Sequence, residues 1–122
     1  MVLSDIIFGS KEIKIYETDS RVSIAGEFIN GDFWYPRGAA NGEGVYYISD
    51  SYHGVIKVFN EENMCLGEFG KGLLAEPSGL LYYERKVYVC DTDNGKIRVF
   101  DKDGKYISDF GPKFKRPNAI EI

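Results

Sequence analysis

The amino-acid sequence predicts an all-β protein built from a repeated unit of short strands. The first indication is a period of 41 residues, since motifs at positions 36 and 50 recur at positions 77 and 91. The second is the alternation of short apolar stretches with turn residues, and the third is the lack of any long stretch with helical periodicity. Repeats of this size indicate units that bury their apolar faces by stacking on one another. The matching motifs are Pro36-Arg37-Gly38 with Pro77-Ser78-Gly79, Asp50 with Asp91, Ile56-Lys57-Val58-Phe59 with Ile97-Arg98-Val99-Phe100, and Phe69-Gly70 with Phe110-Gly111.

The copy that begins at Pro77 shows the strands of one unit most clearly. Asn94-Gly95 predicts a tight turn, because both residue types tolerate the positive φ angles that short hairpins need. The residues after this turn alternate polar and apolar side chains, as a strand with one solvated face does. The expected strands of this unit, from first to fourth, are residues 77–83, 87–91, 96–100 and 105–111.

The two ends of the sequence match different parts of the unit. Asp5 is followed by Gly9, just as Asp50 is followed by Gly54, so the N-terminal residues match the unit from its second strand onward. The last residues match only a first strand. The predicted division is 1–35 for the second to fourth strands of a unit and a connecting loop, 36–76 and 77–116 for two complete units, and 117–122 for a lone first strand.

The ordered run of motifs identifies a family resemblance. Pro-x-Gly, an apolar strand ending in Asp, a turn ending in Gly, an Ile-basic-Val-Phe strand and a terminal Phe-Gly recur in register. This pattern resembles the NHL repeat over nearly the whole chain, although Ala119 replaces the glycine of Pro-x-Gly. Members of the NHL family fold as β-propellers, commonly with six blades. The resemblance therefore implies an all-β, NHL-type β-propeller with three four-stranded blades in this chain.

Three blades do not close a ring, and an open arc would leave apolar blade faces in water. The ends are complementary, which predicts a homodimer formed by strand exchange. In it the strand at 117–122 of each chain completes the N-terminal blade of the other, and the ring has six blades. The alternative is that the sequence is a piece of a longer propeller chain.

Composition and charge favour some classes of protein over others. Hydrophobic residues make up 43% and charged residues 28%, as in a folded rather than a disordered chain. The net charge of −4 argues against nucleic-acid binding, and Lys113-Phe114-Lys115-Arg116 is the main basic cluster. Cys65 and Cys90 occupy different strand positions, which predicts free thiols. With no signal-peptide pattern and no apolar run of membrane-spanning length, these features predict a cytoplasmic protein without membrane contact.

The repeated aspartates and glycines are interpreted as structural positions. Each aspartate ends a strand before a turn, where its carboxylate can accept hydrogen bonds from the N–H groups of that turn. The alternative is a ring of carboxylates around a cation. His53 is the single histidine, which is too few for a zinc site of several histidines, so we expect no metal, no cofactor and no catalytic residue. The structural positions are Asp5, Asp50, Asp91, Gly54 and Gly95.

The residue after each repeat proline is the main candidate for ligand binding. The family resemblance places the start of the first strand near the mouth of the central channel, and these residues are Arg37, Ser78 and Asn118. Arginines there could hold an anion or a carboxylate, and pairing of Arg37 with a neighbouring acid is the alternative. The loops on the same face, 29–35, 71–76 and 112–116, differ between units. Further candidates on this face are Trp34, Tyr35, Tyr52, His53 and Asp93.

The aromatic run Phe33-Trp34-Tyr35 has two interpretations, either as an anchor at a binding surface or as a cover over the end of the core. The function that fits best is a non-catalytic binding scaffold, presenting loops on one propeller face to a protein, a peptide or a small ligand. One alternative is a metal-dependent propeller enzyme of the lyase or lactonase type, with its site in the central channel. RNA binding is a third candidate, which the acidic charge balance disfavours.

Overall fold

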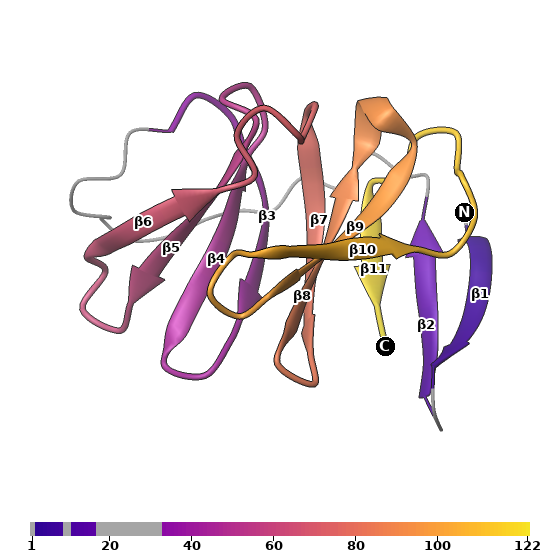
Figure 1. The fold of residues 1–122 in the computed structure, drawn as a ribbon, viewed down its shortest axis with the longest axis horizontal. Coiled ribbons are helices and arrows are strands. Elements are labelled where there is room, and N and C mark those ends of the chain that lie inside the picture. Colours follow the sequence, from indigo (N-terminus) through magenta and orange to yellow (C-terminus); the bar gives the residue numbers. More distant parts are fainter. Residues whose placement is uncertain (1, 9–10, 17–32) are drawn as a thin grey trace.

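The computed structural model describes residues 2–8, 11–16 and 33–122, with side chains from residue 33 onward. The predicted all-β class is confirmed, because the described residues hold eleven strands and a single short 3₁₀ turn. Figure 1 shows the strands in three successive sheets along the long axis of the molecule. In chain order the elements are β1 (Val2–Phe8), β2 (Lys11–Tyr16), β3 (Pro36–Asn41), β4 (Val45–Asp50), β5 (Val55–Asn60), β6 (Cys65–Phe69), β7 (Pro77–Tyr83), β8 (Lys86–Asp91), η1 (Thr92–Asn94), β9 (Lys96–Asp101), β10 (Tyr106–Phe110) and β11 (Ala119–Glu121).

Two of the sheets are four-stranded and antiparallel, each formed by strands consecutive in sequence. One has the order β3-β4-β5-β6 and the other β7-β8-β9-β10. Both have an irregularity at the Pro-x-Gly end of the first strand, where the register shifts between Pro36 and Gly38 and between Pro77 and Leu80. The two sequence repeats therefore form two matching sheets, and even the register shift begins at the repeat proline in both.

The third sheet joins the two ends of the chain, in the order β1-β2-β11. Ala119 lies opposite Tyr16 and Ile120 opposite Ile15, so β11 pairs antiparallel with β2. The expected neighbour of this lone first strand is a second strand in another copy of the chain. In the single chain its backbone groups instead find partners on the corresponding third strand, β2, since an open strand edge pairs with an edge within reach. The predicted fourth strand of this unit lies outside the described residues.

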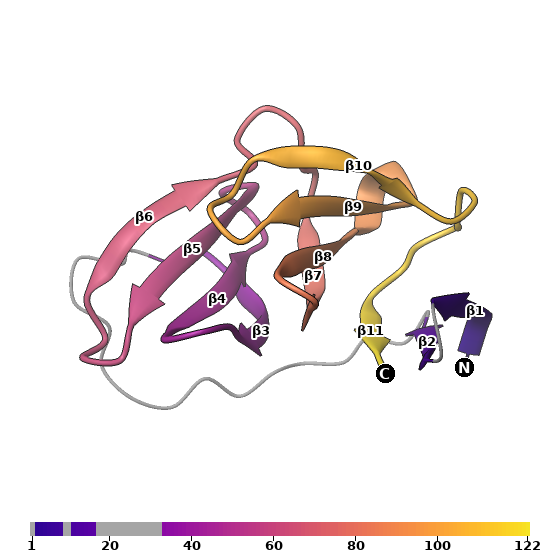
Figure 2. The ribbon, with the colours of Figure 1, turned by 60° about the horizontal axis from the view of Figure 1, so that its bottom comes forward.

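The first strands of the three units lie side by side. Figure 2 shows β3, β7 and β11 along one side of the molecule, with β6 and β10 on the opposite side. The main chains approach so closely here that a Cβ atom at Gly38 would lie 2.1 Å from the Ser78 carbonyl oxygen. A Cβ atom at Gly79 would similarly lie 2.5 Å from the Asn118 carbonyl oxygen, and the Gly79 N–H donates to that oxygen at 2.9 Å. The glycine of Pro-x-Gly is thus required by contact with the next first strand.

The hydrophobic core lies between successive sheets. One cluster fills the space between the two four-stranded sheets, with Tyr47 and Ile56 from one and Val89 and Phe100 from the other. A second cluster joins the sheet β7–β10 to Ile120 of β11. Such stacking is the way in which repeat units bury apolar faces that none can bury alone.

An open arc of three blades would expose apolar side chains on the outward face of the sheet β3–β6. In the structure, apolar side chains on this face are buried. Ile48 and Phe59 are buried there, with 2% and 0% of their surfaces exposed. The ring of Phe33 lies 5.6 Å from that of Phe59, and the ammonium group of Lys57 lies 6.0 Å from the Phe33 ring. Phe33 therefore acts as a cover over the core, which is the second of the two interpretations of the aromatic run.

Candidate functional site

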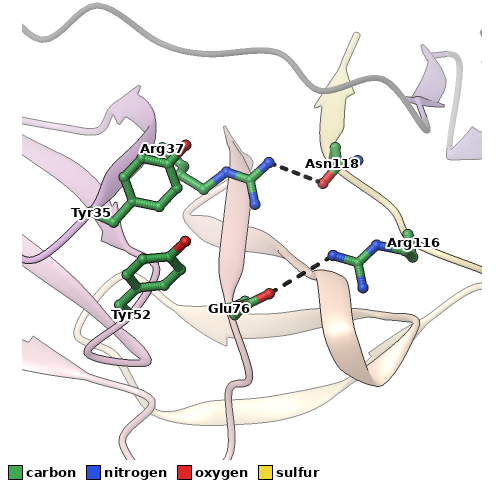
Figure 3. Close-up of a pocket in the computed structure, with 6 residues that line it drawn as sticks. All are labelled: Tyr35, Arg37, Tyr52, Glu76, Arg116 and Asn118. Carbon is green, nitrogen blue, oxygen red and sulfur yellow. Dashed lines mark hydrogen bonds and ion pairs between the residues drawn. The ribbon is translucent and has the colours of Figure 1, made fainter.

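A pocket opens where the first strands meet, and six side chains from four parts of the chain line it. Its volume is about 360 Å³, within the range typical of small-molecule sites. Figure 3 shows the side chains of Tyr35 and Tyr52 on one side, Asn118 and Arg116 on the other, and Arg37 and Glu76 between them. The lining residues are Tyr35, Arg37, Tyr52, Glu76, Arg116 and Asn118.

The repeat explains how these residues come together. Tyr35, Glu76 and Arg116 are the residues that immediately precede the repeat prolines at 36, 77 and 117. They occupy the same position in three units, yet they carry an aromatic, an acidic and a basic side chain. Because β3, β7 and β11 lie side by side, three unlike side chains converge on one opening.

The aromatic wall of the pocket adjoins its central cation. The rings of Tyr35 and Tyr52 lie 4.7 Å apart between centroids, at an angle of 36°. The guanidinium carbon of Arg37 lies 5.8 Å from the centre of the Tyr35 ring, a cation–π distance. Arg37 also reaches across the opening, where its Nη2 donates to Oδ1 of Asn118 at 3.5 Å.

The other wall is an acid–base group. Arg116 is held by Asp93, with Nη1 2.6 Å from the Asp93 carboxylate, while its contact with Glu76 is longer at 3.8 Å. The side-chain hydrogen bond with Asp93, together with burial, raises the pKa of Glu76, although Arg116 and Arg37 act on it in the opposite sense. A ligand cation beside Glu76 would favour its charged form.

Glu76 also has an unusual backbone conformation. Its φ angle is 54°, in the left-handed region, and it shares that region with only three other non-glycine residues in the part of the chain that the structure describes. A left-handed non-glycine residue costs of the order of 1–3 kcal/mol, and such strain concentrates at functional sites. This backbone conformation fixes the direction in which the carboxylate leaves the chain.

Of the residues predicted to bind a ligand, four line this pocket together. They are Tyr35, Arg37, Tyr52 and Asn118, and Asp93 supports them from behind through Arg116. Trp34 and His53 line a neighbouring pocket of about 480 Å³, which shares Tyr52 and Glu76 with the first. Trp34 is 65% exposed, and its ring contacts the rings of Tyr52 and His53.

Ser78 requires a correction. It is 1% exposed and lines neither pocket, because its hydroxyl is too short to reach the surface and bonds to Oγ1 of Thr92 at 2.7 Å. Glu76 and Arg116 were missing from the predicted site residues. Both lie in the loops that differ between units, directly before the repeat prolines, and this position was the signal that could have found them.

The repeated aspartates are structural, but their partners differ from the expected ones. The buried carboxylate of Asp50 accepts hydrogen bonds from the N–H groups of Trp34 and Tyr35, and Asp91 accepts one from Ala75 at 2.7 Å. These N–H groups belong to the loop that enters the blade, 15 or 16 residues upstream, and not to the following turn. Asp50 thereby fixes the pre-proline residue Tyr35 directly, and Asp91 fixes Ala75, the residue before Glu76. The side chain of Asp5 lies outside the described residues.

The turn after each aspartate contributes a side chain as well. His53 and Asn94 are equivalent, and each contacts Oδ2 of its aspartate, at 2.5 Å from Nδ1 in the first case and 2.8 Å from Nδ2 in the second. Gly54 and Gly95 then adopt left-handed φ angles of 70° and 67°, as predicted for turn glycines. Since His53 takes the place of an asparagine, its position has a structural explanation.

Chemistry elsewhere in the described residues is limited. Both cysteines are free thiols, as predicted, with Cys90 buried and Cys65 half-buried, and burial raises the pKa of the Cys90 thiol. Among residues 33–122, no three His, Cys, Asp or Glu side chains gather closely enough to hold a metal ion.

In the basic cluster near residue 114, Phe114 is buried and Arg116 is paired with acids. The described part of the chain has no helix that is long and apolar enough to cross a membrane.

Comparison with known proteins informs the fold. Neither protein-family models nor curated proteins give a match to this chain. A solved structure that is similar is the hydrazine synthase of Kuenenia stuttgartiensis, with a TM-score of 0.60 and 16% sequence identity. The match covers 70% of this chain and spans 26% of that one. At this identity the likeness shows the fold alone, and it supports a β-propeller arrangement of the sheets.

Proposed function

We propose that this chain is a non-catalytic binding scaffold that presents the pocket at the meeting point of β3, β7 and β11 to a ligand. The observation that carries the proposal is the convergence of Tyr35, Glu76 and Arg116. They occupy the same position in the repeat, but their side chains differ in aromaticity and charge. A structural role would be served by three similar residues, whereas recognition of an asymmetric ligand needs three different ones.

The proposed frame is an NHL-type propeller of six blades, closed by two copies of the chain that exchange β11. The regular spacing between the first strands β3, β7 and β11 supports this six-bladed ring. Close main-chain contacts set that spacing, and the same contact occurs between β3 and β7 and between β7 and β11. In such a ring β11 would leave β2 of its own chain and complete the N-terminal blade of the second copy. The pocket would then occur twice, related by the two-fold axis.

The binding role is tested by amide chemical shifts in the ¹⁵N-labelled full chain. The probes are a panel of small aromatic compounds that carry a carboxylate, an amine, an amide or no polar group. We expect at least one class to shift the amides of Tyr35, Tyr52, Glu76 and Asn118 while leaving the β7–β8 turn unchanged. A panel that leaves all the pocket amides in place, or that moves only distant amides, would count against the proposal.

A further inference from the structure

Two long contacts cross the opening of the pocket, one made by the cation Arg37 and one by the anion Glu76. Arg37 meets Asn118 at 3.5 Å, and Glu76 meets Arg116 at 3.8 Å. The contact that lies behind the pocket, between Arg116 and Asp93, is much shorter at 2.6 Å. Contacts near the limit of hydrogen-bond and ion-pair distances are weak, so a ligand can replace them at little cost.

The cationic end suits a carboxylate. A guanidinium presents several N–H donors in one plane and binds a carboxylate through two parallel hydrogen bonds. Asn118 lies within reach of Arg37 and its amide adds donor capacity beside it. Tyr35 lies under the guanidinium and limits its movement, which reduces the entropy lost when it binds.

The anionic end suits an ammonium group close to that carboxylate. Arg37 and Glu76 line the same pocket, so the two charges belong to one site. Arg116 is held closely by Asp93 and only loosely by Glu76, so the Glu76 carboxylate, which lines the pocket, can accept a hydrogen bond from a ligand. A ligand that placed only an anion here would meet the repulsion of Glu76, and one that placed only a cation would meet that of Arg37.

The third wall is apolar and aromatic. Tyr35 and Tyr52 form a pair with ring centroids 4.7 Å apart, and Tyr52 is 50% exposed, so its ring offers a surface to a bound group. An aromatic or large aliphatic group packed there would be stabilised by burial and ring contact.

We propose that this pocket binds a free α-amino acid with an aromatic or large apolar side chain. The α-carboxylate contacts Arg37 and Asn118, the α-ammonium contacts Glu76, and the side chain packs on Tyr35 and Tyr52. This inference rests on the proposed binding function, and it names the class of ligand. It explains why Tyr35 and Glu76 differ at the same repeat position, because the first meets the apolar part of the ligand and the second meets its ammonium group.

Isothermal titration of the full chain with three related probes tests the proposal. The probes are L-phenylalanine, N-acetyl-L-phenylalanine, which lacks the ammonium group, and L-phenylalanine amide, which lacks the carboxylate. We expect the free amino acid to bind and each blocked form to bind at least about tenfold more weakly. Equal binding of all three, or no binding of the free amino acid in the millimolar range, would overturn the proposal.

Two variants assign the ends of the ligand. In Arg37→Gln the preference for L-phenylalanine over its amide should disappear, and in Glu76→Gln the preference over the N-acetyl form should disappear. Matched controls lie in the β7–β8 turn, where Arg85 and Glu84 are exposed and left-handed, with φ angles of 62° and 48°. Arg85→Gln and Glu84→Gln should keep both preferences, and thermal melts should show that all four variants fold.

The outcomes also separate this inference from the proposed function. If N-acetyl-L-phenylalanine binds as well as the free amino acid, the site recognises a carboxylate alone, as at a peptide C-terminus, and the amino-acid proposal is wrong. If only other members of the small aromatic panel shift the pocket amides, the binding function stands and the amino-acid proposal is again wrong. If nothing shifts those amides, both fail.

Discussion

Gly38 packs against the main chain of Ser78 so closely that a Cβ atom would lie 2.1 Å from the Ser78 carbonyl oxygen. The obstacle is the backbone of β7, which cannot rotate away as a side chain can. This contact sets the distance between the first strands of two units, and a substitution there must push the units apart.

Gly38→Ala should therefore lower the free energy of unfolding by about 1–3 kcal/mol, the cost of overpacking a tight interior site. Urea unfolding followed by tryptophan fluorescence measures it. Gly44→Ala is the control, because Gly44 has a left-handed φ of 74° with no atom within 4 Å of a Cβ, so only conformational strain of about 1 kcal/mol applies. A loss at Gly38 no larger than at Gly44 would contradict the close approach.

Asp91→Ala should be among the most destabilising substitutions in the chain. Asp91 is fully buried and accepts from the Ala75 N–H, from Asn94 and from Arg98 at 2.8 Å. Removing it leaves those donors without their acceptor, and breaking a buried ion pair costs about 3–5 kcal/mol. Chemical denaturation tests this, with Asp103→Ala as the control, since that side chain is 80% exposed and its loss should change stability by less than about 0.5 kcal/mol.

Tyr47 makes the stability depend on alkaline pH. Burial, with nearby acidic groups, raises the pKa of Tyr47 to about 12 from 10.0. Between these values the unfolded chain releases the phenolic proton while the folded chain keeps it, so the free energy of unfolding falls as pH rises through that window.

Tyr47→Phe should remove that part of the pH dependence and lower stability at neutral pH by about 1 kcal/mol, because the hydroxyl donates to the Lys102 carbonyl at 2.7 Å. Denaturant titrations at pH 8 and at several alkaline values compare the two proteins. The assignment is wrong if both lose stability equally as pH rises.

Ala119→Gly addresses ring closure. In a closed ring the next first strand would bring the carbonyl of the partner subunit's Arg37 against Ala119, as Ser78 and Asn118 lie against Gly38 and Gly79. The alanine methyl opposes that contact, so removing it should tighten dimerisation by about tenfold. Light scattering across a dilution series measures it against the monomer mass of 13.8 kDa. Wild-type and variant chains that both stay monomeric would overturn the strand-exchanged ring.

The sequence predicted most of the frame, because the repeat reports strands directly. The first strand, expected at 77–83, lies at Pro77–Tyr83, and the second, expected at 87–91, lies at Lys86–Asp91. It did not reveal that Asp91 bonds to Ala75, since spacing along the chain says nothing about which loop returns to a strand end. The sequence also did not reveal that β11 pairs with β2 within a single chain.

The site was predicted in part for a related reason. A comparison of repeats draws attention to residues that stay the same. Glu76 and Arg116 line the candidate site but differ from Tyr35 at the same repeat position, so that comparison did not select them. Arg37 and Ser78 are equivalent in sequence, yet the long side chain reaches the pocket and the short one is buried against Thr92. Side-chain length decides whether the residue at this position reaches the pocket, and an alignment of the repeats does not show that difference.

The position of the three pre-proline residues, just outside the strands, separates them from the contacts that hold the units together. These residues are Tyr35, Glu76 and Arg116. The glycines hold the spacing of the units by main-chain contact and the aspartates tie down the entering loops, so neither task depends on these three side chains. Under the proposed binding function, stability and ligand preference would therefore be encoded by separate residues. A library of chains randomised at these positions alone should contain many folded members with altered ligands, which makes this small repeat a starting point for evolving new binders.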